Sequence, residues 1–182
     1  MTPLYKKIIL ALCALLIIIS VGCGDKKEQR LDANAHFNLG LNHFRNADYD
    51  QAISSFDKAI EMSPMLAEAY YNRGLTYQKK GMHDLAVADY SRTIELDPND
   101  ADAYNNRGLV YSQIKKQYDK ALYDFKKAID LNPKYGTAYN NLAITYYFKK
   151  DYTKAWDNVR KAQELGHQIH PGFLDSLRSA SK

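Results

Sequence analysis

Four asparagines recur along this 182-residue chain at nearly constant spacing, and their side chains are the first candidates for binding chemistry. They are Asn38, Asn72, Asn106 and Asn141, separated by 34, 34 and 35 residues. A carboxamide offers one acceptor oxygen and two donor hydrogens, which match the alternating donors and acceptors of an extended peptide backbone. A column of such groups is able to hold a polypeptide without reading its side chains. Whether the four residues form a column depends on the elements that carry them.

Residues that serve catalysis or metal binding do not form a recognisable site in the sequence. His36 and His43 share one face of an expected helix, and His167 lies close to His170, but neither pair has acidic or cysteine residues at metal-site spacing. The sequence contains no nucleophile elbow, glycine-rich phosphate loop or pair of catalytic carboxylates. We therefore expect no enzyme, no metal and no cofactor.

The charge balance argues against nucleic acid as a partner. Two of the 25 basic residues, Lys6 and Lys7, belong to the leader described next, which leaves 23 basic against 21 acidic residues. Nucleic-acid binding requires many basic residues gathered on one surface. We expect no nucleic-acid partner.

Residues 1–22 have the layout of an export signal: a short basic start, an apolar run from Ile8 to Ile19, and the residues SVG before Cys23. The apolar run is shorter than the about 17–25 residues that a membrane-spanning helix needs. The segment resembles a bacterial lipoprotein signal peptide, although Ser20 departs from the leucine-like residue usual at its place. The alternatives are an uncleaved anchor and a secreted protein with a lone thiol.

The lipoprotein resemblance implies that residues 1–22 are removed and that Cys23 becomes a lipidated N-terminus. Residues 23–32 are then the lipidated end and a polar tether. Gly24, rather than aspartate, follows the cysteine, so the sorting rule of that family favours an outer membrane if the host has one. We expect a bacterial membrane-anchored lipoprotein on the periplasmic or extracellular face.

From Ala33 onward, the sequence repeats itself with a period of 34 or 35 residues. Three columns carry the period: small residues at Gly40, Gly74, Gly108 and Ala143, alanines at Ala52, Ala86, Ala121 and Ala155, and prolines at Pro64, Pro98 and Pro133. Apolar spacing of three and four on both sides of a polar turn predicts two amphipathic helices per unit. The proline ends the second helix, because it lacks an amide proton and restricts the residue before it.

This pattern resembles the tetratricopeptide repeat (TPR) and covers Ala33 to about His167. The resemblance implies an all-α TPR α-solenoid of four helix-turn-helix repeats, at residues 33–66, 67–100, 101–135 and 136–169. A C-terminal capping helix and tail are expected at residues 170–182, with Pro171 in the first turn. Arg73 and Arg107 lie at the edge of the core, where each is expected to pair with an acid on a neighbouring helix.

The asparagine column falls on the side of each first helix that is turned away from its own hairpin. In the TPR family this side lines the concave surface, and the arrangement resembles the asparagine ladder by which some TPR domains hold peptide main chain. An aliphatic column at Leu41, Leu75, Leu109 and Ile144 runs beside it. The further residues of the predicted peptide site are Phe37, Tyr71 and Tyr147 as aromatic anchors, and Arg45 and Lys79 as positive charges.

Three alternatives remain open for this face. In the first, the asparagines are solvent-tolerant residues of a common repeat variant. In the second, the aromatic residues pack internally, and Phe148 under the C-terminal helix is the foremost example. In the third, the protein is a structural subunit of an envelope complex or a homo-oligomer that docks through convex or edge surfaces without peptide capture. The expected function is a lipid-anchored adaptor of the cell envelope that binds other proteins or extended peptide segments, of the class that serves pilus, outer-membrane or cell-wall enzyme assembly. The carboxylate clamp of chaperone-binding TPRs is not supported, because acids such as Glu68 and Asp102 occupy this face.

Overall fold

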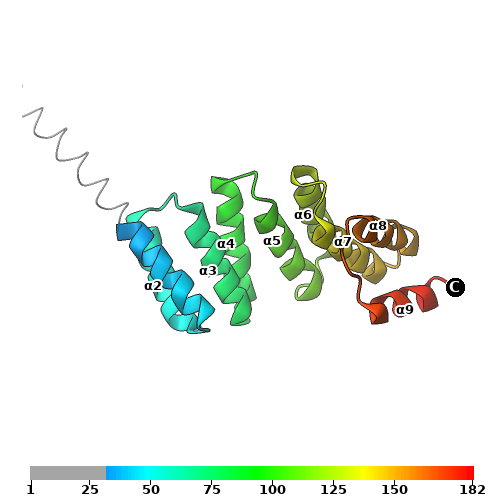
Figure 1. Ribbon diagram of the computed structural model, residues 1–182, viewed down its shortest axis with the longest axis horizontal. Helices are drawn as coiled ribbons and strands as arrows, with labels where there is room; N and C mark the ends of the chain where they lie inside the picture. The colour runs from blue at the N-terminus through cyan, green and yellow to red at the C-terminus, as the bar shows by residue number, and fades with distance from the viewer. Residues whose placement is uncertain (1–31) are drawn as a thin grey trace, which may run out of the picture. The chain divides into compact units, whose positions relative to one another are not determined.

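The computed structural model describes residues 32–182, so the predicted leader and the lipidation site at Cys23 lie outside the described residues. Every regular element among residues 32–182 is a helix (Figure 1). The chain divides into two compact units, one ending at Ala69 and the other comprising Tyr70–Lys182. Each unit is described by itself below.

The helices form hairpins whose bounds follow the predicted period. The first described helix covers residues 32–45. It is followed by α2 (Tyr49–Met62), α3 (Ala67–Lys79), α4 (His83–Leu96), α5 (Ala101–Gln113), α6 (Tyr118–Leu131), α7 (Gly136–Phe148), α8 (Tyr152–Glu164) and α9 (Pro171–Ala180). The predicted all-α fold with a C-terminal helix is confirmed.

In the first unit, the helix at residues 32–45 packs on α2 through a small residue facing a large ring. A Cβ added at Gly40 would lie 2.5 Å from the Phe56 ring, closer than real Cβ contacts allow. Phe56, Ala52 and Ala59 of α2 are fully buried. The small-residue column therefore exists because the two backbones approach each other at that level.

In the second unit, consecutive helices from α4 to α9 pack against their neighbours. The small-residue contact recurs, since a Cβ at Gly108 of α5 would meet the Phe125 ring of α6 at 2.9 Å. The largest core cluster joins α6, α7 and α8 and includes Leu177 of α9, which is fully buried. Helix α9 thus closes the apolar end of the fourth hairpin, as expected for a capping helix.

The ends of the helices follow from local chemistry. Helices α2, α4 and α6 each end two residues before a proline, at Pro64, Pro98 and Pro133. The Asp100 carboxylate caps α5 by accepting a hydrogen bond from the Ala103 amide at 2.8 Å. His170 caps α9 in the same way, its Nδ1 accepting from the Gly172 amide at 3.1 Å, with Pro171 at the first helical position.

Candidate functional site

The first helices of repeats two to four, α3, α5 and α7, are joined by polar contacts within the second unit. The Asn106 side chain of α5 donates to the Tyr71 hydroxyl of α3 at 2.9 Å. Ser112 of α5 and Thr145 of α7 share a buried hydrogen bond of 2.9 Å between their hydroxyls. The face predicted to bind peptide is therefore built from three helices held in register by side-chain hydrogen bonds.

The predicted asparagines of α5 and α7 belong to a continuous network of amides. Asn141 Nδ2 donates to Asn105 Oδ1 at 2.9 Å, and Asn105 Nδ2 donates to Asn106 Oδ1 at 3.4 Å. With the contact from Asn106 to Tyr71, these residues form what we call the amide network (Tyr71, Asn106, Asn105 and Asn141). It runs across all three helices.

The four predicted asparagines are not equivalent, which corrects the picture of a uniform amide stripe. Asn38 is exposed, Asn72 and Asn106 are half-buried, and Asn141 is only 8% exposed. Asn141 turns inward because α5 and α7 approach closely enough for its amide to pair with Asn105. The column stays a predicted binding site, with Asn106 the accessible amide nearest its centre.

Acidic and phenolic groups lie on this face near the N-terminal ends of its helices. The Tyr135 hydroxyl donates a hydrogen bond to the Asp102 carboxylate, which ties the start of α7 to the start of α5. Burial raises the pKa of Tyr71 to about 12, with the charges of Asp102 and Asp100 adding to the effect. The Tyr71 phenol thus stays protonated at physiological pH and has its hydroxyl hydrogen to donate, whereas Tyr135 already donates its own to Asp102.

A hollow of about 410 Å³ opens where α3, α4 and α5 meet, and we call it the α3–α5 hollow. It is lined by Leu75, Gln78, Lys79, His83, Asn106, Leu109, Val110, Gln113 and Ile114. Four predicted site residues, Leu75, Lys79, Asn106 and Leu109, thus surround one space. Aliphatic walls, an amide and a lysine at one opening suit a short polypeptide segment with an apolar side chain.

His83 lines this hollow and carries an unsatisfied buried group. Its Nδ1 is buried and has no hydrogen-bond partner among the described residues. A buried polar atom without a partner costs about 1–3 kcal/mol. His83 was not predicted, because its position at the start of α4 gives no sign in the sequence that it faces α5.

The predicted residues of the first unit have mixed surroundings. Phe37 packs on Phe56 with ring centroids 5.9 Å apart, so it is part of its own hairpin rather than a free anchor. Tyr71 makes the same contact with Tyr90 in the second unit, at 6.0 Å. Leu41 is half-buried, and Arg45 is exposed with a 3.5 Å contact to Asn42.

At the C-terminal end, Tyr147 is a packing residue. Its ring meets Phe173 of α9 edge to face at 5.7 Å, and Ile144 on the same helix is half-buried. The packing predicted for Phe148 under the C-terminal helix belongs to Tyr147 instead, because position 147 faces α9. Phe148 is 51% exposed and stacks on Tyr118 at 5.9 Å.

The predicted structural arginines are confirmed. Arg73 makes two hydrogen bonds to Asp89, at 2.8 and 2.7 Å, and Arg107 makes two to Asp124, at 2.9 and 2.8 Å. The Asp124 side chain is only 1% exposed. These bidentate pairs join the two helices of repeats two and three.

Asn105 is the other site residue that the sequence reasoning missed. A signal was available, since asparagine is doubled at positions 105–106 and 140–141.

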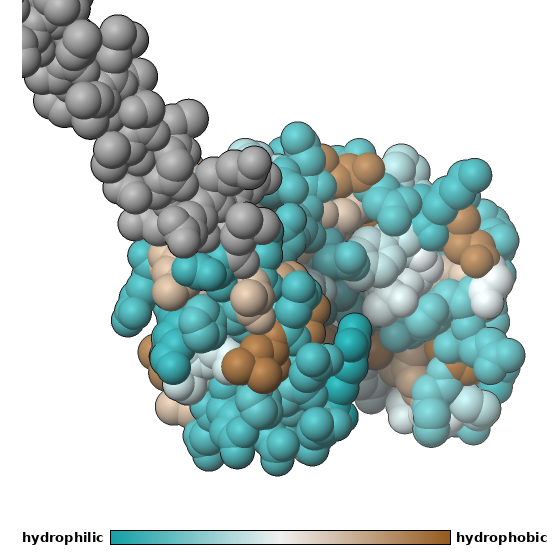
Figure 2. Space-filling view, turned by 60° about the vertical axis from the view of Figure 1, so that its left-hand side comes forward, coloured by the Kyte–Doolittle hydropathy of each residue, from teal (hydrophilic) through white to brown (hydrophobic). Residues whose placement is uncertain are grey.

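Among residues 32–182, no group of three or more His, Cys, Asp or Glu side chains is placed to hold a metal ion. None of the described helices has the length and apolar character required to span a bilayer. Hydrophilic side chains predominate on the face drawn in Figure 2, and hydrophobic ones form small separate patches.

Family models of the tetratricopeptide repeat match most of the described chain. One model matches residues 67–100 and 101–135, and related TPR models match 27–64, 48–81 and 125–157. The chain belongs to the tetratricopeptide repeat family. No curated protein sequence matches it significantly.

Solved structures of other TPR proteins share the fold. MamA from Desulfovibrio magneticus RS-1 is 27% identical, with a TM-score of 0.69 over 74% of this chain and 76% of that one. Pseudomonas aeruginosa pilF is 25% identical, with a TM-score of 0.67 over 77% of this chain and 62% of that one. The first TPR of Spaghetti (RPAP3), solved with an HSP90 peptide, is 23% identical with a TM-score of 0.62 over 65% and 93%, and shows the fold alone.

Proposed function

We propose that this protein is a non-enzymatic adaptor that binds a polypeptide segment of a partner in the α3–α5 hollow. The observation that carries the proposal is the convergence of Leu75, Lys79, Asn106 and Leu109 on one space of about 410 Å³. Aliphatic walls supply apolar contact, and the Asn106 amide is placed to meet the partner's main chain.

The amide network supports the proposal by fixing the orientation of Asn106. Its Oδ1 accepts from Asn105 and its Nδ2 donates to Tyr71, so the side chain is held before a partner arrives. One donor hydrogen and one lone pair remain for an incoming peptide group. Preorganisation of this kind lowers the entropy cost of binding.

The test is capture of partners by the double variant Asn72→Ala/Asn106→Ala. We expect weaker capture with unchanged helicity, because each change removes a half-buried amide of the binding face and leaves the helix backbone and the apolar core in place. The matched control is Asn46→Ala/Asn99→Ala, which removes two exposed turn asparagines that do not line the hollow. If the control loses as much capture as the test variant, or if neither loses any, the hollow is not the binding site.

We further propose that lipid on Cys23 holds the adaptor at the cell envelope, on the periplasmic or extracellular face. The support comes from the sequence of residues 1–24, which lies outside the described structure. The Cys23→Ala variant is expected either to be lost from membrane fractions or to keep its leader attached. Mass spectrometry of the wild-type N-terminus checks the same point, and an unmodified Cys23 contradicts it.

A second candidate is docking through the outer side of the hairpins. A separate hollow of about 390 Å³ lies between α5 and α6 and includes Tyr111, Lys120 and Tyr123 in its lining. Tyr123 is 57% exposed, which is unusual for a tyrosine that serves only packing. A structural subunit without peptide capture would use this surface instead.

A further inference from the structure

The turns that join the two helices of repeats two, three and four carry the same combination of residues. Each has two adjacent lysines and one exposed hydrophobic side chain beside them. The lysine pairs are Lys79–Lys80, Lys115–Lys116 and Lys149–Lys150. Beside them, Met82 is 40% exposed, Ile114 is 50% exposed and Phe148 is 51% exposed.

Contacts between neighbouring repeats make these three turns one continuous surface. Lys115 forms an ion pair with Asp84 at the start of α4. Lys149 pairs with Asp119 at the start of α6 at 2.7 Å. The Tyr118 and Phe148 rings stack with their centroids 5.9 Å apart, which joins the turn of repeat three to the turn of repeat four. We call residues 79–84, 113–120 and 148–154 the basic edge.

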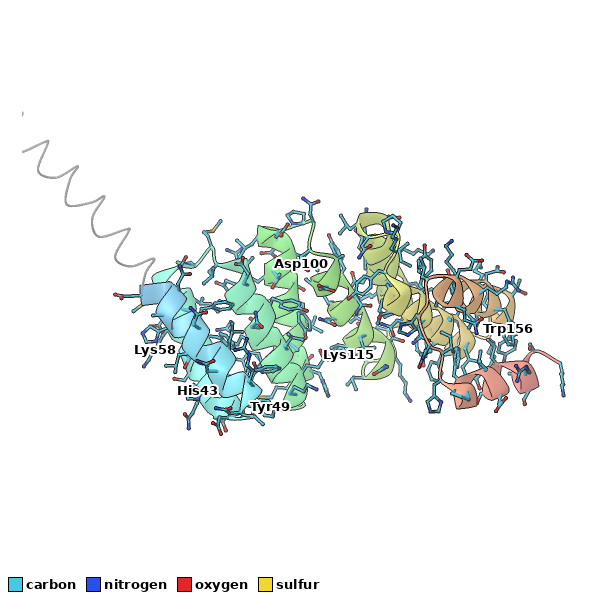
Figure 3. The ribbon with its side chains drawn as sticks, viewed as in Figure 1. His43, Tyr49, Lys58, Asp100, Lys115 and Trp156 are labelled. Carbon is cyan, nitrogen blue, oxygen red and sulfur yellow. The ribbon has the colours of Figure 1, made fainter. Side chains whose placement is uncertain are left out.

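The second unit is electrically polarised between this edge and the opposite one. The basic edge has eight lysines and three aspartates, a net charge of +5. The opposite edge, formed by residues 95–102, 130–137 and 164–168, has six acidic residues and one lysine, a net charge of −5. Asp100 and Lys115 mark the two edges at opposite ends of α5 (Figure 3). An anionic surface would attract one edge and repel the other.

We infer that the basic edge lies against an anionic lipid surface, with Met82, Ile114 and Phe148 entering the interfacial region. Lysines attract anionic headgroups by about 1 kcal/mol each, and their stems and single apolar side chains suit the boundary between headgroups and acyl chains. A row of isolated hydrophobes, each beside two lysines, favours a lipid surface over an acidic protein, which would offer fixed pockets. The basic edge shares Lys79, His83, Gln113 and Ile114 with the lining of the α3–α5 hollow, but the lipid contact requires neither a bound peptide nor lipid on Cys23.

The test uses tryptophan reporters in the full-length chain, reconstituted with vesicles whose acyl chains carry a bromine quencher. Trp156 is the only tryptophan, so Trp156→Phe gives a silent background. Phe148→Trp then reports on the basic edge. Leu131→Trp, at a residue of the opposite edge that is 37% exposed, is the matched control reporter.

We expect phosphatidylglycerol vesicles to quench the reporter at 148 and not the one at 131, and phosphatidylcholine vesicles to quench neither. Added salt should reduce the quenching, because it screens the attraction. Equal quenching at both positions, or no quenching at 148 by phosphatidylglycerol, would overturn the inference. If soluble polyglutamate shifts the emission at 148 and vesicles do not, the edge binds acidic polypeptide and the lipid assignment is wrong.

A charge-matched pair of variants separates the edge from net charge. Lys79→Gln/Lys116→Gln/Lys150→Gln removes three exposed lysines of the basic edge. At about fivefold in association constant for each lysine, the loss is about a hundredfold, and quenching at 148 should fall to the level at 131. The control variant removes the exposed Lys126, Lys127 and Lys134 in the same way and should keep the quenching. Equal losses in the two variants would mean that only total charge matters, which contradicts the inference.

Discussion

At the scale of single residues, the repeats fill one pair of positions in two ways. Two repeats hold a buried arginine–aspartate ion pair there, and the other two hold uncharged residues. In repeats two and three, Arg73 and Arg107 pair with Asp89 and Asp124. In repeats one and four the arginine column holds leucine, and the aspartate column holds Ser55 and Asn158. The charged residues therefore occur together or not at all, as expected if a buried carboxylate without its arginine is costly.

The first prediction concerns this pair. Arg107→Leu alone leaves the Asp124 carboxylate buried without its partner, and we expect a loss of about 3–5 kcal/mol in the free energy of unfolding. The double variant Arg107→Leu/Asp124→Ser installs the combination of the first repeat and should recover most of that loss. Urea unfolding of both variants measures the difference. A double variant as unstable as Arg107→Leu would show that the carboxylate is not the source of the cost.

The second prediction concerns the phenol of Tyr71. Burial raises its pKa from 10.0 to about 12, so between these values the folded chain keeps a proton that the unfolded chain has lost. Below this window both states hold the proton, and the residue adds no pH dependence. Stability should therefore fall more steeply with rising pH in the wild type than in Tyr71→Phe across the window. Parallel curves in urea unfolding experiments would contradict the assigned burial.

At the scale of the element, the turns between paired helices show a left-handed residue in every repeat. Gly81 fills this position in the second repeat, with φ of 75°. Ala47, Lys116 and Lys150 fill it in the other three, with φ of 62°, 51° and 62°. A residue with a Cβ is strained there by about 1–2 kcal/mol, whereas glycine is not.

The third prediction follows from that strain. Ala47→Gly should raise the free energy of unfolding by up to about 1 kcal/mol, after the greater freedom of glycine in the unfolded chain is subtracted. The same substitution at Ala88, exposed within α4, should lower it by about 1 kcal/mol. Thermal and urea unfolding give both values. Two changes of the same sign would show that the turn is not strained.

The sequence predicted the elements well because their signals are local and repeated. Proline fixed the ends of α2, α4 and α6, and small residues marked where helices cross, at Gly40 and Gly108 among others. What the sequence did not predict depends on contacts between repeats. The inward turn of Asn141 and the exchange of roles between Tyr147 and Phe148 are set by the distance to a neighbouring helix, which periodicity does not specify.

At the scale of the whole molecule, the second unit carries three surfaces with different chemistry. The α3–α5 hollow is amide-lined and aliphatic, the basic edge is cationic with exposed hydrophobes, and the opposite edge is acidic. A lipid surface against the basic edge would orient the unit, and the hollow would then be presented in a fixed direction. The predicted lipid on Cys23 and the basic edge would together give two attachments, which bind a membrane more stably than either alone.

The central claim is that a partner polypeptide occupies the α3–α5 hollow. It is tested most directly by placing a photo-crosslinking amino acid at position 109 or position 123 in the full-length protein in its host cell. The account predicts a crosslinked partner at 109 that disappears in Asn72→Ala/Asn106→Ala, and no partner at 123. Crosslinking at 123 with none at 109 would contradict it and would identify the outer side of the hairpins as the docking surface.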